Sequence, residues 1–186
     1  MRQYHVKNLF NNTGLRWLWL TVIFLIIDQI TKQWVANTFD YRETLAVFPF
    51  FNLYYVHNEG AAFSFLADQG GWQRWFFSAI AAIASIIFVI WMAKTPKQHR
   101  LLSIAFALIL SGALGNLIDR VLFGYVIDFL DFHWQGSHFA AFNIADSVIF
   151  IGAALMIIES FTQQNSQKNN QKNEQQKTTI KNIKDK

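Results

Sequence analysis

Four apolar segments dominate this chain, and each is long enough to cross a membrane. They cover residues 15–35, 72–92, 101–122 and 139–161. A helix needs about 20 residues to span the hydrocarbon core of a bilayer. Hydrophobic residues make up 53% of the chain and charged residues 15%, against roughly 25% charged residues in a soluble domain. The sequence therefore predicts an integral membrane bundle of four transmembrane helices within residues 1–162.

The Lys and Arg residues are distributed unevenly along the segments that connect these helices. Three lie in residues 1–16, three in residues 94–100 and six in the tail after residue 161, whereas residues 122–139 contain none. Cytoplasmic loops of membrane proteins are enriched in Lys and Arg. We therefore expect both termini in the cytoplasm and the two other loops outside. The net charge of +4 comes from these flanks, so no nucleic-acid partner is expected.

Two outward stretches favour a small extracytoplasmic β-sheet. The stretch FPFFNLYYVHNEGAAFSFL has aromatic runs on both sides of residues 57–60, which predicts a hairpin at that point. The stretch YVIDFLDF interleaves apolar and acidic residues as a half-buried strand does. Residues 163–186 are rich in Gln, Asn and Lys. That composition predicts a disordered, basic cytoplasmic tail that anionic lipid attracts.

Four aspartates, Asp28, Asp119, Asp128 and Asp146, lie inside or beside the apolar segments. An ionisable group in hydrocarbon is costly, so its presence suggests a functional site. At a rise of about 1.5 Å per helical residue, the three within the segments fall in the outer half of the membrane. The predicted acidic cluster is therefore shallow and faces one side.

Two of the aspartates have polar neighbours that favour a structural role. Asp28 and Lys32 are spaced i, i+4, which predicts an ion pair on one helix face. Asn116, Asp119 and Arg120 follow a patch of small residues and share one face near the outer end of the third segment. Polar side chains and small residues commonly hold membrane helices together. Both groups are interpreted as helix-to-helix contacts.

Asp128 and Asp146 differ because neither has a Lys or Arg within four positions. Burial without a cation raises the pKa of a carboxyl group, and two close carboxyls cannot both ionise easily. Such a pair shares a proton, so that one carboxylate activates a water while the other donates to a carbonyl oxygen. The pattern favours aspartic-protease chemistry. By position alone, Asp131 fits the role of Asp128 equally well.

Three other functions remain open at this point. His57, His133 and His138 could hold zinc with Asp131 or Asp128, although the chain has no HExxH motif. Intramembrane acids also build proton relays in transporters, but the inner halves of the second and fourth segments are apolar up to Glu159. An inert scaffold would not need so concentrated an acidic cluster. The absence of Cys excludes thiol catalysis and disulfides.

Five ordered sequence blocks closely resemble the lipoprotein signal peptidase (signal peptidase II) family of bacterial membrane aspartic proteases. They are DQITK at Asp28, NEGAAFS at Asn58, GNLIDR at Asn116, VIDF at Asp128 and FNIAD at Asn143. The resemblance spans residues 16–161 and excludes the tail. The family pattern tolerates variation at Glu59.

The resemblance implies specific roles for residues within these blocks. Asp128 and Asp146 match the catalytic pair, and Asp28 and Lys32 match a block with a structural role. Residues that match those shaping and supporting the site are Asn58, Gly60, Asn116, Asp119, Arg120 and Asn143. Asn58 and Arg120 are candidates to bind backbone or lipid carbonyls.

The resemblance also implies what the protein acts on and where. The expected substrate is a prolipoprotein that carries diacylglycerol on a cysteine, with cleavage just before that cysteine. We expect a multi-pass protein of the bacterial cytoplasmic (inner) membrane, with an extracytoplasmic β-cradle and the site facing outward. Membrane lipids are the other expected partner. No cofactor, no metal and no second subunit are required, so a monomer is expected.

Overall fold

Four helices in the described part of the chain are long and apolar enough to cross a membrane. The computed structural model describes residues 10–60 and 71–163. The helical segments are Gly14–Thr38, Trp72–Lys94 (α3), Arg100–Leu122 (α4) and Ile144–Gln163; the first consists of a short 3-10 turn, η1 (Gly14–Trp17), and α2 (Leu18–Thr38). The predicted fold class, a four-helix membrane bundle with a small sheet, is confirmed. Residues 164–186 of the predicted tail lie outside the described residues.

Helix α4 occupies the centre of the bundle. In its most apolar stretch 67% of the residues are buried, against 22% or less in the other three spans. Two of its glycines allow the close approach: a Cβ on Gly115 would lie 2.5 Å from Oδ2 of Asp28, and one on Gly112 would overlap the backbone oxygen of Ala145. Glycine is otherwise unfavourable inside a helix by about 1 kcal/mol. Its position here is explained by helix packing.

The outer faces of the other helices carry large apolar side chains. Trp75 is 63% exposed and Phe150 75% exposed. Lipid tails are as apolar as these side chains, so such faces suit contact with a bilayer.

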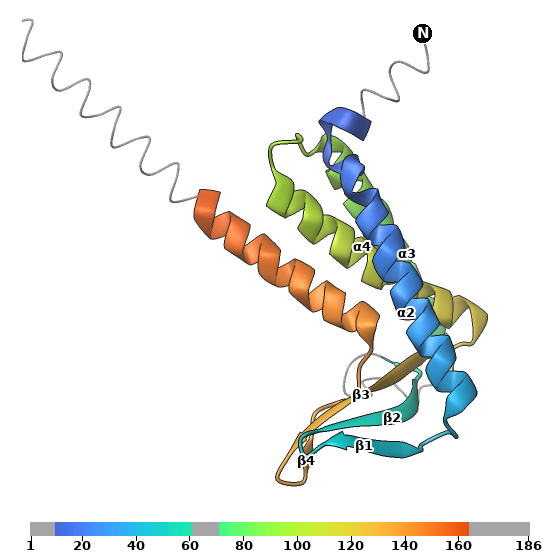
Figure 1. Ribbon diagram of the computed structural model, residues 1–186. Helices are drawn as coiled ribbons and strands as arrows, with labels where there is room; N and C mark the ends of the chain where they lie inside the picture. Colours follow the sequence, from blue (N-terminus) through green and yellow to red (C-terminus); the bar gives the residue numbers. More distant parts are fainter. Residues whose placement is uncertain (1–9, 61–70, 164–186) are drawn as a thin grey trace, which may run out of the picture.

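The sheet lies at one end of the bundle, where α2 ends and the helix Ile144–Gln163 begins (Figure 1). Its strands are β1 (Thr44–Phe48), β2 (Phe51–Asn58), β3 (Val126–Trp134) and β4 (Ser137–His138), paired antiparallel in chain order. A cluster of Val35, Tyr55, Ile127 and Phe129 packs the sheet against the end of α2. The loop between α3 and α4 lies at the opposite end (Figure 1).

The hairpin forms at a different place from the one predicted. Strands β1 and β2 are joined by a tight turn at Pro49 and Phe50, with Phe48 opposite Phe51. The predicted turn at residues 57–60 was therefore misplaced for this pair: residues 57 and 58 continue β2 and pair with β3. Proline fits a turn because its φ angle is preset and it has no N–H to give to a strand. The second aromatic run, residues 61–66, lies outside the described residues.

The last helix begins at Ile144, five residues later than the predicted span of 139–161. Residues 139–143 are not helical, and Phe142 forms an isolated β-bridge with Leu130. Phe142 bonds to the backbone of β3, because its oxygen accepts from the N–H groups of Phe129 and Leu130 at 3.0 and 2.8 Å. This contact brings Asn143 beside β3.

Candidate active site

Asp128 and Asp146 come from different elements that meet near the C-terminal end of α4. Asp128 is in β3, only 2% exposed, while Asp146 is in the first turn of the last helix and half-buried. Asp128 and its cross-strand neighbour Val56 are paired in the ladder that joins β2 to β3. The fold therefore places one aspartate inside the sheet–helix junction and the other at its edge.

Asn143 connects the two aspartates. Its side-chain Nδ2 donates to Oδ1 of Asp128 at 2.7 Å. Its backbone N–H donates to Oδ2 of Asp146 at 3.3 Å, and its Oδ1 accepts from the backbone N–H of Asp146 at 3.0 Å. These last two bonds form a reciprocal cap at the helix N-terminus. The same residue that begins the helix thus fixes both carboxyl groups.

The remaining carboxyl oxygens are held by neutral amides. Asn58 Nδ2 donates to Oδ2 of Asp128 at 2.9 Å, and Asn116 Nδ2 donates to Oδ1 of Asp146 at 2.8 Å. Asn58 is itself oriented, since its Oδ1 accepts from the N–H of Gly60 at 3.1 Å. Among the described residues, no Lys or Arg forms an ion pair with either aspartate.

This environment raises the pKa of Asp128 to about 7. Burial is the largest cause, and the charge of Asp146 adds to it, while the bonds from Asn58 and Asn143 act in the opposite direction. Near neutral pH, Asp128 can therefore hold a proton beside the more exposed carboxyl group of Asp146. A general acid next to a general base is the arrangement that acid–base hydrolysis requires.

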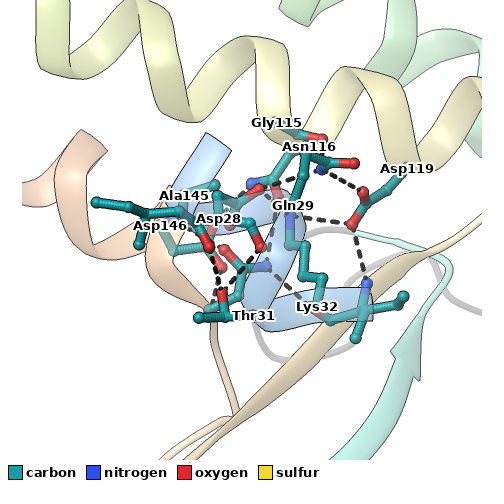
Figure 2. Close-up of polar contacts among 12 residues, drawn as sticks. Asp28, Gln29, Thr31, Lys32, Gly115, Asn116, Asp119, Ala145 and Asp146 are labelled. Atoms are coloured by element: carbon teal, nitrogen blue, oxygen red, sulfur yellow. Dashed lines mark hydrogen bonds and ion pairs between the residues drawn. The ribbon is translucent and has the colours of Figure 1, made fainter. Parts of the chain in front are cut away.

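A buried lysine organises the supporting residues (Figure 2). Lys32 is fully buried, and its Nζ lies 2.9 Å from Oδ2 of Asp28, 2.9 Å from Oδ2 of Asp119 and 2.9 Å from Oδ1 of Asn116. The predicted pair of Asp28 and Lys32 is present. Because Lys32 occupies the amide oxygen of Asn116, the amide nitrogen is the atom that faces Asp146.

Both acidic partners of Lys32 reach the backbone next to an active-site aspartate. Asp28 Oδ1 accepts from the N–H of Ala145 at 2.8 Å, and Asp119 Oδ2 accepts from the N–H of Ile127 at 3.2 Å. Ala145 precedes Asp146, and Ile127 precedes Asp128. The buried network therefore fixes the positions of both segments that carry the acid pair.

Arg120 connects α4 to Gly60, just after the end of β2. Its Nη2 donates to the oxygen of Gly60 at 3.0 Å and its Nη1 to the oxygen of Asn116 at 3.3 Å. The guanidinium also lies over the ring of Phe77, 5.5 Å from the centroid. Asp119 instead joins the group through Lys32.

The site has one residue that sequence reasoning missed. Gln29 Nε2 donates to Oδ1 of Asp119 at 2.9 Å and lies 3.3 Å from the oxygen of Gly115, which links α2 to α4. An amide inside an apolar segment was the available signal. Sequence spacing cannot identify its partners, because they lie about 86 and 90 positions away.

The residues considered as alternatives have contacts of their own. Asp131 accepts from Asn52 Nδ2 at 2.9 Å and contacts Nδ1 of the exposed His138 at 2.9 Å. His57 stacks on Tyr125 at 3.7 Å between ring centroids. Within residues 10–60 and 71–163, no three His, Asp or Glu side chains are grouped so as to hold a metal ion.

A cavity of about 750 Å³ opens beside Asp146. Asn58, Asn116 and Arg120 form its polar wall, and the rest of its lining includes Val126, Phe139, Phe142, Ile149, Phe150 and Ile151. An apolar space with a few polar groups at one end is typical of a ligand site. It suits a long apolar ligand whose reactive part lies at the acid pair.

Known proteins resemble the chain over most of its length. The signal peptidase (SPase) II family model matches residues 20–162. A lipoprotein signal peptidase of Shewanella woodyi is 55% identical over 151 residues, which cover 81% of this chain and 86% of that protein. One of Alteromonas mediterranea is 55% identical over 153 residues, covering 82% and 84% respectively. A solved bacterial membrane enzyme superposes with a TM-score of 0.71 at 36% identity, covering 78% of this chain and 87% of the other.

Proposed function

Because this chain belongs to the signal peptidase II family, we propose that it cleaves prolipoproteins as an aspartic endopeptidase. The proposed substrate carries a diacylglyceryl group on a cysteine, and the bond before that cysteine is cut. The observation that carries the mechanism is the position of Asn143, which bonds to both Asp128 and Asp146. The names of the relatives support the signal-peptide substrate.

In the proposed first step, a water between the two carboxyl groups attacks the scissile carbonyl carbon. Asp146 takes a proton from the water, and Asp128 gives its proton to the carbonyl oxygen, which yields a neutral tetrahedral diol. The raised pKa of Asp128 supports its role as the acid. The half-buried position of Asp146 beside the apolar cavity supports its role as the base.

In the second step, the carbon–nitrogen bond breaks. Asp146 gives its proton to the departing amine of the cysteine residue, and Asp128 recovers a proton from the diol hydroxyl. The products are a carboxylic acid on the signal peptide and a free amine on the lipid-modified cysteine. Both aspartates return to their starting states, so no cofactor is consumed.

The apolar cavity is the proposed site of the signal helix and lipid chains. Asn58 and Arg120 line its polar end next to the acid pair, where they can donate to substrate carbonyls. Neutral amides, and not cations, bond to the two carboxyl groups, so a proton can be shared between Asp128 and Asp146. Support for this assignment comes from the apolar lining, which includes Phe139, Ile149 and Phe150.

We infer a multi-pass protein of the inner membrane with both termini in the cytoplasm. The Lys/Arg-rich loop between α3 and α4 lies opposite the sheet (Figure 1), and such loops are cytoplasmic. The acid pair then lies near the outer surface, where water reaches a substrate that a lipid anchor holds in the membrane. A monomer contains every residue used in this mechanism.

The proposal is tested with purified protein and two precursors, one with and one without the diacylglyceryl group. The expected result is a product from the modified precursor whose first residue is the lipid-modified cysteine, detected by mobility shift and mass spectrometry. Equal cleavage of both precursors, or cleavage at another bond, would contradict the proposed specificity.

A further inference from the structure

A second, smaller cavity lies on the other side of the acid pair. Its volume is about 300 Å³, and Asp128 forms part of its wall. It shares Asn58, Ala140 and Ala141 with the larger cavity, where Asp146 forms part of the wall. A peptide that passes over Asn58 from one cavity to the other would therefore carry its scissile bond past both carboxyl groups.

The two cavities differ in chemistry. The larger one is lined mainly by aromatic and aliphatic side chains. The smaller one is lined by Tyr41, Arg42, Tyr54 and His57 in addition to the shared residues. The substrate differs in the same way along its length, since a signal peptide is apolar and the chain that follows it is polar. The smaller cavity thus matches the polar side of the cleavage point.

Arg42 is held in a backbone conformation that is rare for its residue type. Its φ angle is 68°, in the left-handed region that few residues other than glycine adopt. Its N–H donates to the oxygen of Tyr55 at 2.9 Å, while Asp40 and Glu43 close the turn through two bonds of 2.7 and 2.8 Å. Strained backbone that is fixed by its surroundings is common at ligand sites.

Stacked rings position the guanidinium group at this cavity. Arg42 lies over the ring of Tyr41, 5.3 Å from its centroid. The ring of Tyr41 lies against His57 in a tilted arrangement, with centroids 4.5 Å apart, and His57 stacks on Tyr125 at 3.7 Å. Tyr55 contributes its hydroxyl, 2.8 Å from Nε2 of His57. The arginine thus lies at one end of a row of rings whose other end is Tyr125, just before β3.

The charge of Arg42 is not neutralised within the described part of the protein. Its guanidinium has no ion pair with any described carboxylate. Burial lowers the pKa of His57, which the charge of Glu59 offsets in part, so that ring is neutral at pH 7. Among the described residues lining this cavity, Arg42 alone carries a permanent positive charge.

We propose that the cavity of Tyr41, Arg42, Tyr54 and His57 binds the mature chain just after the cleavage point, with Arg42 selecting an acidic side chain there. This inference rests on the proposed function. It gives a binding site to the mature chain, because the apolar cavity is assigned to the signal helix and the lipid chains. A guanidinium binds a carboxylate through charge-assisted hydrogen bonds. Tyr41, Tyr54 and Asn58 line the same cavity and would surround the polar peptide.

The test compares diacylglyceryl precursor peptides that carry Asp, Asn or Lys at one of the three positions after the cysteine. The Asp peptide should be cleaved with a kcat/KM about five to ten times that of the Lys peptide, as expected for a partly exposed charge-assisted bond. The difference should lie in KM and should shrink at high salt. Arg42→Gln should abolish the preference.

Two further variants make the result decisive. Arg42→Gly removes the guanidinium but suits the positive φ angle, so it should lose the preference even if Arg42→Gln folds poorly. Arg100→Gln removes an equally exposed positive charge at the far end of α4 and should keep the preference. An unchanged preference in both Arg42 variants, or its loss in Arg100→Gln, would overturn the assignment.

Binding measured without cleavage separates this inference from the proposed function. The Asp128→Asn variant should bind a fluorescent Asp peptide several times more tightly than its Lys counterpart, on the same charge-assisted bond. Cleavage without any charge preference contradicts this cavity assignment alone, whereas charge-selective binding without cleavage by the native protein contradicts the peptidase function alone. The same assay is run in vesicles with and without anionic lipid. If the effect of replacing Arg42 depends on the anionic lipid and not on the charge of the peptide, the ligand is a lipid headgroup and the peptide assignment is overturned.

Discussion

Asp28 accepts a hydrogen bond from the backbone N–H of Ala145 at 2.8 Å, although the two residues are 117 positions apart. This bond ties the middle of α2 to the first turn of the last helix, one residue before Asp146. Asp119 makes the equivalent bond to Ile127, one residue before Asp128. Lys32 lies between the two carboxyl groups, with its Nζ 2.9 Å from an oxygen of each. The first block of the sequence therefore acts on the active site through the backbone, without contacting the proposed substrate.

Replacing Lys32 should strongly destabilise the protein. Lys32→Met leaves two buried carboxylates without their cation, and breaking a buried ion pair in this way costs about 3–5 kcal/mol. Thermal unfolding in detergent measures the loss. Lys94→Met, at the exposed end of α3, should change the free energy of unfolding by less than about 0.5 kcal/mol. Equal effects of the two substitutions would contradict the role given to Lys32.

Activity should fall as the pH rises above about 7, because Asp128 then loses the proton that it gives to the carbonyl oxygen. The decline in kcat/KM should approach about tenfold per pH unit, as for the loss of one essential proton. A pH–rate profile with saturating and limiting substrate checks this. Constant activity between pH 7 and about 9 would argue against Asp128 as the acid.

The same group should make folding stability depend on pH. The pKa of Asp128 in the folded protein, about 7, lies above the ordinary aspartate value of 3.8, so the folded state binds more protons between these pH values. Its contribution to stability is therefore fully present below pH 3.8 and is lost as the pH rises through 7. The free energy of unfolding, measured with denaturant, should depend on pH differently for the native protein and for Asp128→Asn between pH 3.8 and 7. Parallel curves would contradict the raised pKa.

Two substitutions of Asn143 should separate its two roles. Asn143→Ala removes both the helix cap and the bond to Asp128, and a lost cap costs about 1 kcal/mol. Asn143→Ser keeps a capping oxygen but loses the amide that donates to Asp128. Both should lose activity, and only the Ala variant should lose the cap's stability. Because the Asn143 bond lowers the pKa of Asp128, the alkaline limb of the Ser variant should move to higher pH; a shift to lower pH would contradict this.

The helices were predictable from the sequence, because hydrophobic length is a local property. The lack of nearby cations, also a local property, led to the proposal of Asp128 and Asp146 as the acid pair. The Asp28–Lys32 pair was predictable for the same reason, as its partners are one helical turn apart. The contact of Lys32 with Asp119 was not predicted, since nothing local shows that α2 and α4 meet at Gly115. The hairpin was misplaced because β2 continues through His57 to pair with β3, a contact between distant segments.

The start of the last helix shows the same limit. Phe139 and Phe142 continue the apolar pattern, so hydropathy extended the span over them. Backbone bonds from β3 hold Phe142 in an extended conformation, and Asn143 then caps the helix. The spacing of Asn143 and Asp146, three residues apart, is typical of a reciprocal helix cap. The bond from Asn143 to Asp128 could not be predicted from the sequence, because it joins the start of the last helix to β3.

Strong chelators should leave activity unchanged. His57 lies against Tyr41 and stacks on Tyr125, and His138 contacts Asp131. Cleavage measured before and after dialysis against a chelator checks this, with added zinc as the control. Loss of activity that zinc restores would favour the metallopeptidase interpretation of these histidines.

The central claim is tested most directly by cleavage of a diacylglyceryl prolipoprotein with three matched variants: Asp128→Asn, Asp146→Asn and Asp131→Asn. All three remove one carboxylate, but Asp131 bonds only to Asn52 and His138 among its described neighbours. The first two should lose at least about a thousandfold in kcat while they remain folded and membrane-inserted, and the third should keep activity close to that of the native enzyme. Normal cleavage by either of the first two variants would contradict the mechanism.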